Sequence, residues 1–152
     1  KRQSGKRDGL STIQTTKWTN NSGIMIKNGL LLHQITGETK YLDHAKATAQ
    51  GTYNVFVRMS GAGILAFPNN DPWFNTKLLS AYMDIIPYFP QAKSYVDIYT
   101  AFIDYGYKNC RTENKLFYEG WVGNQGRYGN LLNQAAVIES YALIANYILS
   151  QE

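Results

Sequence analysis

One segment near the start of the chain is apolar on nearly every side of a predicted helix. It runs from Trp18 to Glu38 and reads WTNNSGIMIKNGLLLHQITGE, in which Lys27 is the only charged residue between Gly23 and Ile35. A surface helix normally has one apolar stripe and one charged face. This helix must therefore be covered on most of its surface by other parts of a protein.

The opening of this segment recurs twice, at a constant spacing. An aromatic residue, any residue and then asparagine appear together three times, and the first residues of successive copies are 55 positions apart. The copies are Trp18-Thr19-Asn20, Trp73-Phe74-Asn75 and Tyr128-Gly129-Asn130. Each copy precedes an apolar segment, and amphipathic segments lie between them. Repetition at a fixed period indicates an architecture built from repeated units.

The hydrophobic pattern predicts two layers of helices. Apolar inner helices are expected near residues 22–35, 75–88 and 131–149, and amphipathic outer helices near 39–58 and 91–109. The connectors 61–67 and 116–121 are rich in glycine and aromatic residues, which is consistent with short strands or turns. With the rest of a barrel or a partner chain in place, the inner helices should be markedly more buried than the outer ones.

Two architectures contain alternating inner and outer helices: an open solenoid and a closed α/α toroid. Tetratricopeptide solenoids repeat every ~34 residues, which is too short for the period found here, so the toroid is favoured. Two and a half hairpins cannot close a ring, and an open part of one would expose a large apolar surface, which monomers avoid. We expect the chain to be part of a larger barrel or to pair with another chain.

Polar and aromatic residues are predicted to gather at one end of this ring. A flat aromatic face stacks on the C–H face of a pyranose, and amides supply the donors and acceptors that sugar hydroxyls need. The candidate substrate-binding residues are Trp18, Asn20, Asn21, Asp71, Trp73, Asn75, Glu119, Trp121, Tyr128 and Asn130. In the alternative interpretation, the aromatic residues belong to the core and the asparagines cap helices.

Composition argues against several other classes of protein. The net charge is +4, but four basic residues lie within the first seven positions, so no basic face suits nucleic acid. The single cysteine, Cys110, excludes an internal disulfide and a cysteine-built metal site. His33 and His44 have no partners at ligand spacing, and no apolar run approaches the ~20 residues needed to span a membrane. We expect neither a metal nor a cofactor.

Five motifs, in order along the chain, resemble glycoside hydrolase family 76, the endo-α-1,6-mannanases. They read WTNNSG, ITGETKYLDHA, DPWFNTKLLSAYMDI, NKLFYEGW and LLNQAAVIESYALIA. The resemblance extends from Asp8 onward and implies an (α/α)6 barrel, of which residues 1–152 would form roughly the second half, the C-terminal part of one domain. It also implies an extracytoplasmic protein (periplasmic, cell-surface or secreted) that binds an α-mannan-like saccharide. One departure is Asn133 before Gln134, where relatives often have Asp-Gln.

Glycoside hydrolysis usually requires two carboxyl groups. The family's pair is two consecutive aspartates in the N-terminal half, and these 152 residues contain no Asp-Asp. The resemblance therefore implies a chain that supplies substrate-binding subsites but no catalytic residue, and that does not hydrolyse α-1,6-mannan alone. Two alternatives are a non-catalytic glycan-binding protein and a helical interaction protein on the same scaffold.

Overall fold

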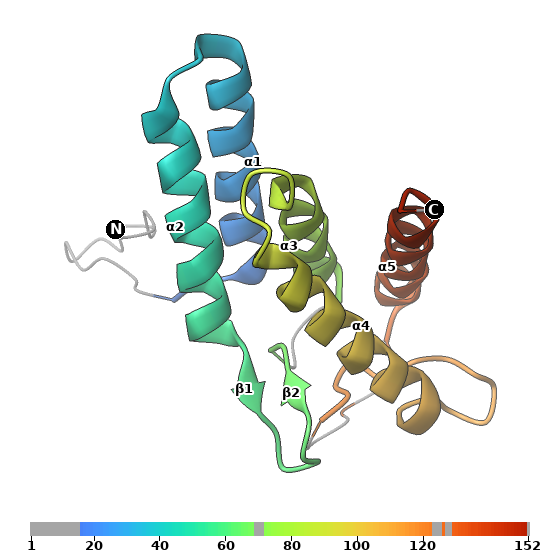
Figure 1. Cartoon of the computed structure of the whole chain (residues 1–152). Helices are drawn as coiled ribbons and strands as arrows, with labels where there is room; N and C mark the ends of the chain where they lie inside the picture. Colours follow the sequence, from blue (N-terminus) through green and yellow to red (C-terminus); the bar gives the residue numbers. More distant parts are fainter. Residues whose placement is uncertain (1–15, 69–71, 123–125, 127–128, 152) are drawn as a thin grey trace, which may run out of the picture.

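The computed structural model describes residues 16–68, 72–122, 126 and 129–151, and these residues are mostly helical (Figure 1). The elements are α1 (Thr19–Thr36), α2 (Thr39–Phe56), β1 (Arg58–Met59), β2 (Leu65–Ala66), α3 (Pro72–Ile85), α4 (Ala92–Asn109) and α5 (Leu131–Leu149). In the described part of the chain, strand is limited to the β1–β2 hairpin, in which Arg58 pairs with Ala66 and Met59 with Leu65 in antiparallel fashion. The predicted all-α class and the five helices are confirmed.

Local signals explain where the helices begin and end. The first turn of α3 begins at Pro72. Proline suits this position because the first N–H groups of a helix have no partner within it, so the missing N–H costs nothing. Gly37 ends α1 in the left-handed conformation, with φ of 71°, and its N–H donates to the His33 carbonyl. Helix α3 ends at Ile85, before Pro87, because proline cannot continue the ladder of helical hydrogen bonds.

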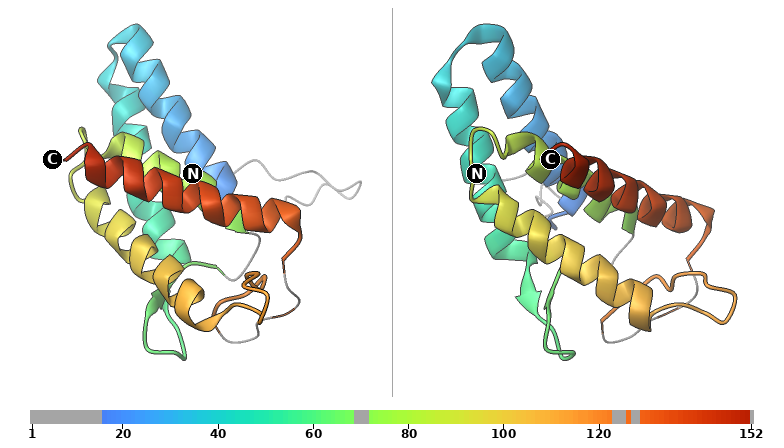
Figure 2. Two further views of the ribbon diagram at one scale, coloured as in Figure 1. Left: turned by 90° about the vertical axis from the view of Figure 1, so that its right-hand side faces the viewer. Right: turned by 45° about the vertical axis from the view of Figure 1, so that its right-hand side comes forward.

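The helices form two layers. The inner layer has α3 in the middle, with α1 and α5 packed on either side of it (Figures 1 and 2). In the outer layer, α2 packs on α1 and α4 packs on α3, and α2 and α4 also contact each other. The predicted alternation of inner and outer helices is therefore present.

Buried aromatic and aliphatic side chains join the layers. Leu78, Leu79, Tyr82 and Ile85 of α3 are fully buried, and Tyr95 and Tyr99 of α4 are almost so. A small polar network lies inside this core: Thr76 Oγ1 lies 2.8 Å from Ser140 Oγ, which lies 3.3 Å from the Tyr99 hydroxyl. Burial raises the pKa of Tyr99 to about 12, because the charged phenolate would lose its hydration in this core.

The order of burial was predicted for inner helices covered by the rest of a barrel or by a partner. In this chain alone, α3 has the most buried residues, and α1 and α5 have more than the outer helix α2 but fewer than the outer helix α4. Helix α4 has more buried residues than α1 or α5, although it belongs to the outer layer. Its buried side is covered by Phe67 of one connector and Trp121 of the other. In contrast, α1 and α5 each have a single inner neighbour, α3.

Apolar side chains remain exposed at both ends of the inner row. On α1 they are Ile24, Met25, Leu31, Leu32 and Ile35, and on α5 they are Leu131, Leu132, Ile138, Ile148 and Leu149. Exposed apolar patches of this kind usually mark interaction surfaces.

The close approach of α1 to α3 depends on Gly23. A Cβ placed there would lie 2.6 Å from the Lys77 carbonyl oxygen, which is backbone and cannot turn away. Although alanine favours helix by ~1 kcal/mol over glycine, we expect Gly23→Ala to lower the free energy of unfolding by about 1–2 kcal/mol through overpacking. Gly51→Ala on α2 is the matched control, since nothing lies within 4 Å of its added Cβ. In urea titrations that control should gain about 0.5–1 kcal/mol; a similar gain for Gly23→Ala would contradict the close packing.

Candidate functional site

The N-terminal ends of α1 and α3 lie side by side. Thr19 Oγ1 donates a hydrogen bond to Asn75 Oδ1 at 3.0 Å, and this bond joins the first turns of the two helices. Above it, Phe74 packs edge-on against Trp18 and Trp73, with ring centroids 5.5 and 5.6 Å apart. These three rings form a continuous aromatic row, so Trp18 and Trp73 lie at the same end of the fold, as predicted.

The polar residues beside the aromatic row differ in their environments. Trp18 is 42% exposed, and Asn21 is exposed on the first turn of α1. Asn20 is partly buried, and its Oδ1 is buried with no hydrogen-bond partner within the described residues. The first N–H groups of a helix have no partner within that helix and can donate to a ligand.

The three asparagines of the repeated tripeptide are not structurally equivalent. Asn20 is the second residue of α1 and Asn75 the fourth residue of α3, whereas Asn130 precedes α5 and caps it by accepting from the Asn133 N–H at 3.0 Å. Asn75 is 3% exposed, and its Nδ2 donates to the Pro68 carbonyl. The equivalence predicted from the 55-residue spacing is therefore wrong. Asn130 caps a helix, as the alternative interpretation holds, whereas Asn75 is a buried structural residue that does not act as a cap.

Trp121 is a core residue and does not lie on an accessible rim. It is 4% exposed, its Nε1 donates to the Tyr118 carbonyl, and its ring packs on Phe102. The sequence suggested a site residue because the connectors before the inner helices were expected to meet at one end of the ring. In the fold, the connector turns inward, and Gly106 of α4 leaves room for the indole.

The remaining candidates are only partly placed. Glu119 is exposed in the connector between α4 and α5. Asp71 and Tyr128 lie outside the described residues. Gln134 has a structural role, since its amide group accepts from the Phe117 N–H and donates to the carbonyls of Phe117 and Gly129. It thereby fastens the start of α5 to the connector.

A row of polar residues on α3 was missed by the sequence analysis. Trp73, Lys77, Ser80 and Asp84 follow one another at helical spacing and therefore share one face of α3. Lys27 of α1 donates to Ser80 Oγ at 2.8 Å and pairs with Asp84 at 2.8 Å. From the other side, Glu139 of α5 pairs with Lys77 at 2.9 Å. The helical spacing of three polar residues after Trp73, within a largely apolar helix, was the signal that could have revealed this row.

Other kinds of site find little support in the described residues. They contain no group of three or more His, Cys, Asp or Glu side chains that could hold a metal ion. None of the described helices is both long and apolar enough to cross a membrane.

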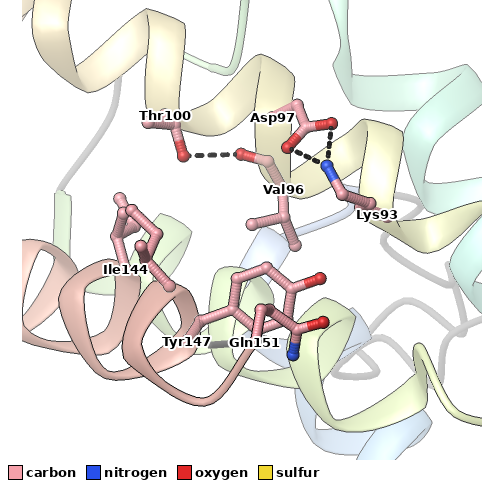
Figure 3. Close-up of a pocket in the computed structure, with 8 residues that line it drawn as sticks. Lys93, Val96, Asp97, Thr100, Ile144, Tyr147 and Gln151 are labelled. Atoms are coloured by element: carbon pink, nitrogen blue, oxygen red, sulfur yellow. Dashed lines mark hydrogen bonds and ion pairs between the residues drawn. The ribbon is translucent and has the colours of Figure 1, made fainter.

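A groove of about 220 Å³ lies between α4 and α5, away from the aromatic row (Figure 3). Val96, Ile144 and Tyr147 form part of its apolar lining. Its polar residues include Lys93 and Asp97, which pair with each other at 2.8 Å along α4. The groove has no carboxyl pair of the type that hydrolyses glycosides.

Comparison with known proteins identifies relatives of nearly the whole chain. The model of glycosyl hydrolase family 76 matches residues 3–147. No curated protein matches the chain.

Solved structures share the fold. A family 76 glycoside hydrolase (mannosidase), Bt3792 from Bacteroides thetaiotaomicron VPI-5482, has a TM-score of 0.73 and 23% identity, over 93% of this chain and 40% of its own. The GH76A α-1,6-mannanase from Salegentibacter sp. HEL1_6 has a TM-score of 0.64 and 21% identity, over 91% and 44%. An inactive variant of that mannanase, with two consecutive aspartates replaced by alanine, was solved with α-1,6-mannotetrose and has a TM-score of 0.65, with 23% identity over 91% and 44% of the two chains. The present chain thus spans less than half the length of each of these structures.

Proposed function

The chain belongs to glycosyl hydrolase family 76, and from this membership we propose that it is the C-terminal part of an endo-α-1,6-mannanase-like enzyme. In this role it supplies substrate-binding subsites, and the catalytic aspartate pair belongs to the other part of the barrel. The family match over residues 3–147 is the observation that carries the proposal.

The sequence supports the proposed division of labour. The chain contains no two consecutive aspartates, while the inactive mannanase variant has two consecutive aspartates replaced. The 152-residue chain alone is therefore proposed to be inactive on α-1,6-mannan. The exposed apolar residues of α1 and α5 are the surfaces that the rest of the barrel, or a second chain, is proposed to cover.

The aromatic row is the proposed carbohydrate-binding feature. Trp18, Phe74 and Trp73 lie at the N-terminal ends of two inner helices, and indole rings stack on the apolar faces of sugars. Asn21 and Glu119 are exposed and can bond to hydroxyls. Asp71 and Tyr128 are retained as proposed site residues on sequence grounds alone. An extracytoplasmic location is proposed from the family.

Removing one ring tests the role of the aromatic row. In the full-length protein, Trp73→Ala is expected to weaken the binding of α-1,6-mannotetrose several-fold, because an aromatic platform contributes about 1 kcal/mol beyond area burial. Isothermal titration calorimetry gives the affinity, and a thermal melt shows whether stability is retained. A melting temperature that falls while affinity stays unchanged would assign Trp73 to the core and remove it from the site.

A non-catalytic glycan-binding protein on the same scaffold is the second candidate, favoured by the absence of an aspartate pair from these residues. The two candidates differ in one property of the full-length protein. Release of mannooligosaccharides from α-1,6-mannan supports the enzyme, whereas saturable binding without release supports the lectin-like function.

A further inference from the structure

Resting on the proposed function, we propose that the Lys77–Glu139 ion pair, together with Trp73, binds one sugar ring of an uncharged α-mannoside. Trp73 supplies the stacking surface, the Lys77 ammonium group donates to hydroxyl oxygens, and the Glu139 carboxylate accepts from hydroxyl protons. This assigns a substrate-positioning role to two charged residues that lie outside the aromatic row.

The three side chains converge from two helices. Lys77 follows Trp73 by one turn of α3, and its Nζ lies 5.4 Å from the centroid of the Trp73 ring. Glu139 approaches from α5 and accepts from the same Nζ through both carboxylate oxygens, at 2.9 and 3.2 Å. The pair therefore holds the ammonium group over the indole, which fixes the spacing between the aromatic ring and the charged groups.

The pair retains capacity for a ligand. An ammonium group has three N–H donors, and a carboxylate can accept about four hydrogen bonds, so two contacts between them leave donors and acceptors on both. The side chains are 32% and 43% exposed, so a ligand can reach them. Vicinal hydroxyls of a pyranose both donate and accept, which matches a site that offers both functions side by side. Because the pair is neutral overall, it suits an uncharged sugar better than an ionic one.

A second ion pair on the same face provides a matched control. Lys27 of α1 pairs with Asp84 at 2.8 Å, and the two side chains are 43% and 49% exposed. Asp84 lies seven residues beyond Lys77 on α3, about 10 Å along the axis at 1.5 Å per residue. This pair also joins an inner helix to α3, but it lies away from Trp73. Its loss reports what an inter-helix ion pair contributes to the fold alone.

The experiment measures the affinity of the full-length protein for α-1,6-mannotetrose by calorimetry, beside the melting temperature of each variant. Lys77→Met is expected to raise Kd about tenfold, through the loss of charge-assisted hydrogen bonds to the sugar. Glu139→Gln, which keeps an acceptor, should raise Kd less than Lys77→Met does. Lys27→Met should leave Kd within about twofold of the wild type. Because partly exposed ion pairs contribute little to stability, all three variants should melt close to the wild type.

Exchanging the two charges separates the role of the pair in sugar binding from its role in joining α3 and α5. The double variant Lys77→Glu with Glu139→Lys restores an ion pair between α3 and α5 but moves the donor away from its place over Trp73. The proposal expects its melting temperature to stay close to that of the wild type while Kd stays raised. A return of Kd to the wild-type value in this double variant would show that the pair only joins the helices, and it would overturn the proposal.

Two further outcomes are decisive. Wild-type affinity in Lys77→Met, or an equal loss of affinity in Lys27→Met, overturns the assignment of Lys77 and Glu139 while leaving the proposed family activity intact. A wild-type protein that neither binds α-1,6-mannotetrose nor hydrolyses α-1,6-mannan overturns the proposed function itself. The two failures are therefore distinguishable.

Discussion

Replacing Trp121 by alanine is expected to lower the free energy of unfolding by about 3–5 kcal/mol, the cost of truncating a buried tryptophan. The side chain is 4% exposed, and its ring packs against Phe102 and Phe117 at centroid distances of 5.0 and 5.7 Å. Its loss would also remove the hydrogen bond from Nε1 to the Tyr118 carbonyl. Denaturant titration followed by circular dichroism measures the change.

Trp18→Ala is the matched control for that experiment. Trp18 is 42% exposed and contacts Phe74 edge-on, so its truncation should cost about 1 kcal/mol or less. If both substitutions lowered the free energy of unfolding equally, Trp121 would not be a core residue and would again be a candidate for the accessible surface.

The second large effect is expected at Asn75. Its Oδ1 accepts from Thr19 and its Nδ2 donates to the Pro68 carbonyl, each at 3.0 Å, in a site where Thr19 is fully buried. Asn75→Ala leaves both partners without these bonds, and each unsatisfied buried group costs about 1–3 kcal/mol. We therefore expect a loss of about 2–4 kcal/mol in the free energy of unfolding, measured by urea titration.

Asn20→Ala tests whether this effect is specific to the position. Asn20 has the same place in the repeated tripeptide, but its Oδ1 has no hydrogen-bond partner among the described residues. Its replacement should change stability by less than about 1 kcal/mol. If the two asparagines proved equally costly to replace, the repeat would define a common structural role after all, contrary to the observed geometry.

The sequence pattern was sufficient to identify the helices. Apolar residues at helical spacing and the stop signals at Gly37, Pro87 and Pro90 predicted the five segments, and each observed boundary lies within a few residues of its prediction. This success has a local cause, because periodicity, glycine and proline act through the backbone within one or two turns. The family was likewise identifiable, since its motifs occur in order along the chain and the family model matches residues 3–147.

The sequence could not decide which polar and aromatic residues face outward. Trp18 and Trp121 belong to the same residue type, and both lie outside the helices, yet one is 42% exposed and the other 4%. The difference arises because Gly106 of α4 leaves a space that Trp121 fills, and that contact joins residues from different segments. Asn20 and Asn75 likewise share a motif, but only Asn75 lies where the first turns of α1 and α3 meet.

The sequence by itself therefore determined the class of fold, the order of inner and outer helices, and the family. The tertiary structure alone decided which residues meet: it placed Trp18 beside Trp73 through Phe74, buried Asn75 and Trp121, and brought Glu139 to Lys77 across 62 positions of the chain. The physical reason is the separation along the chain of the residues that interact. Helix formation depends on neighbours a few residues apart, whereas a binding surface depends on packing between segments that the chain separates.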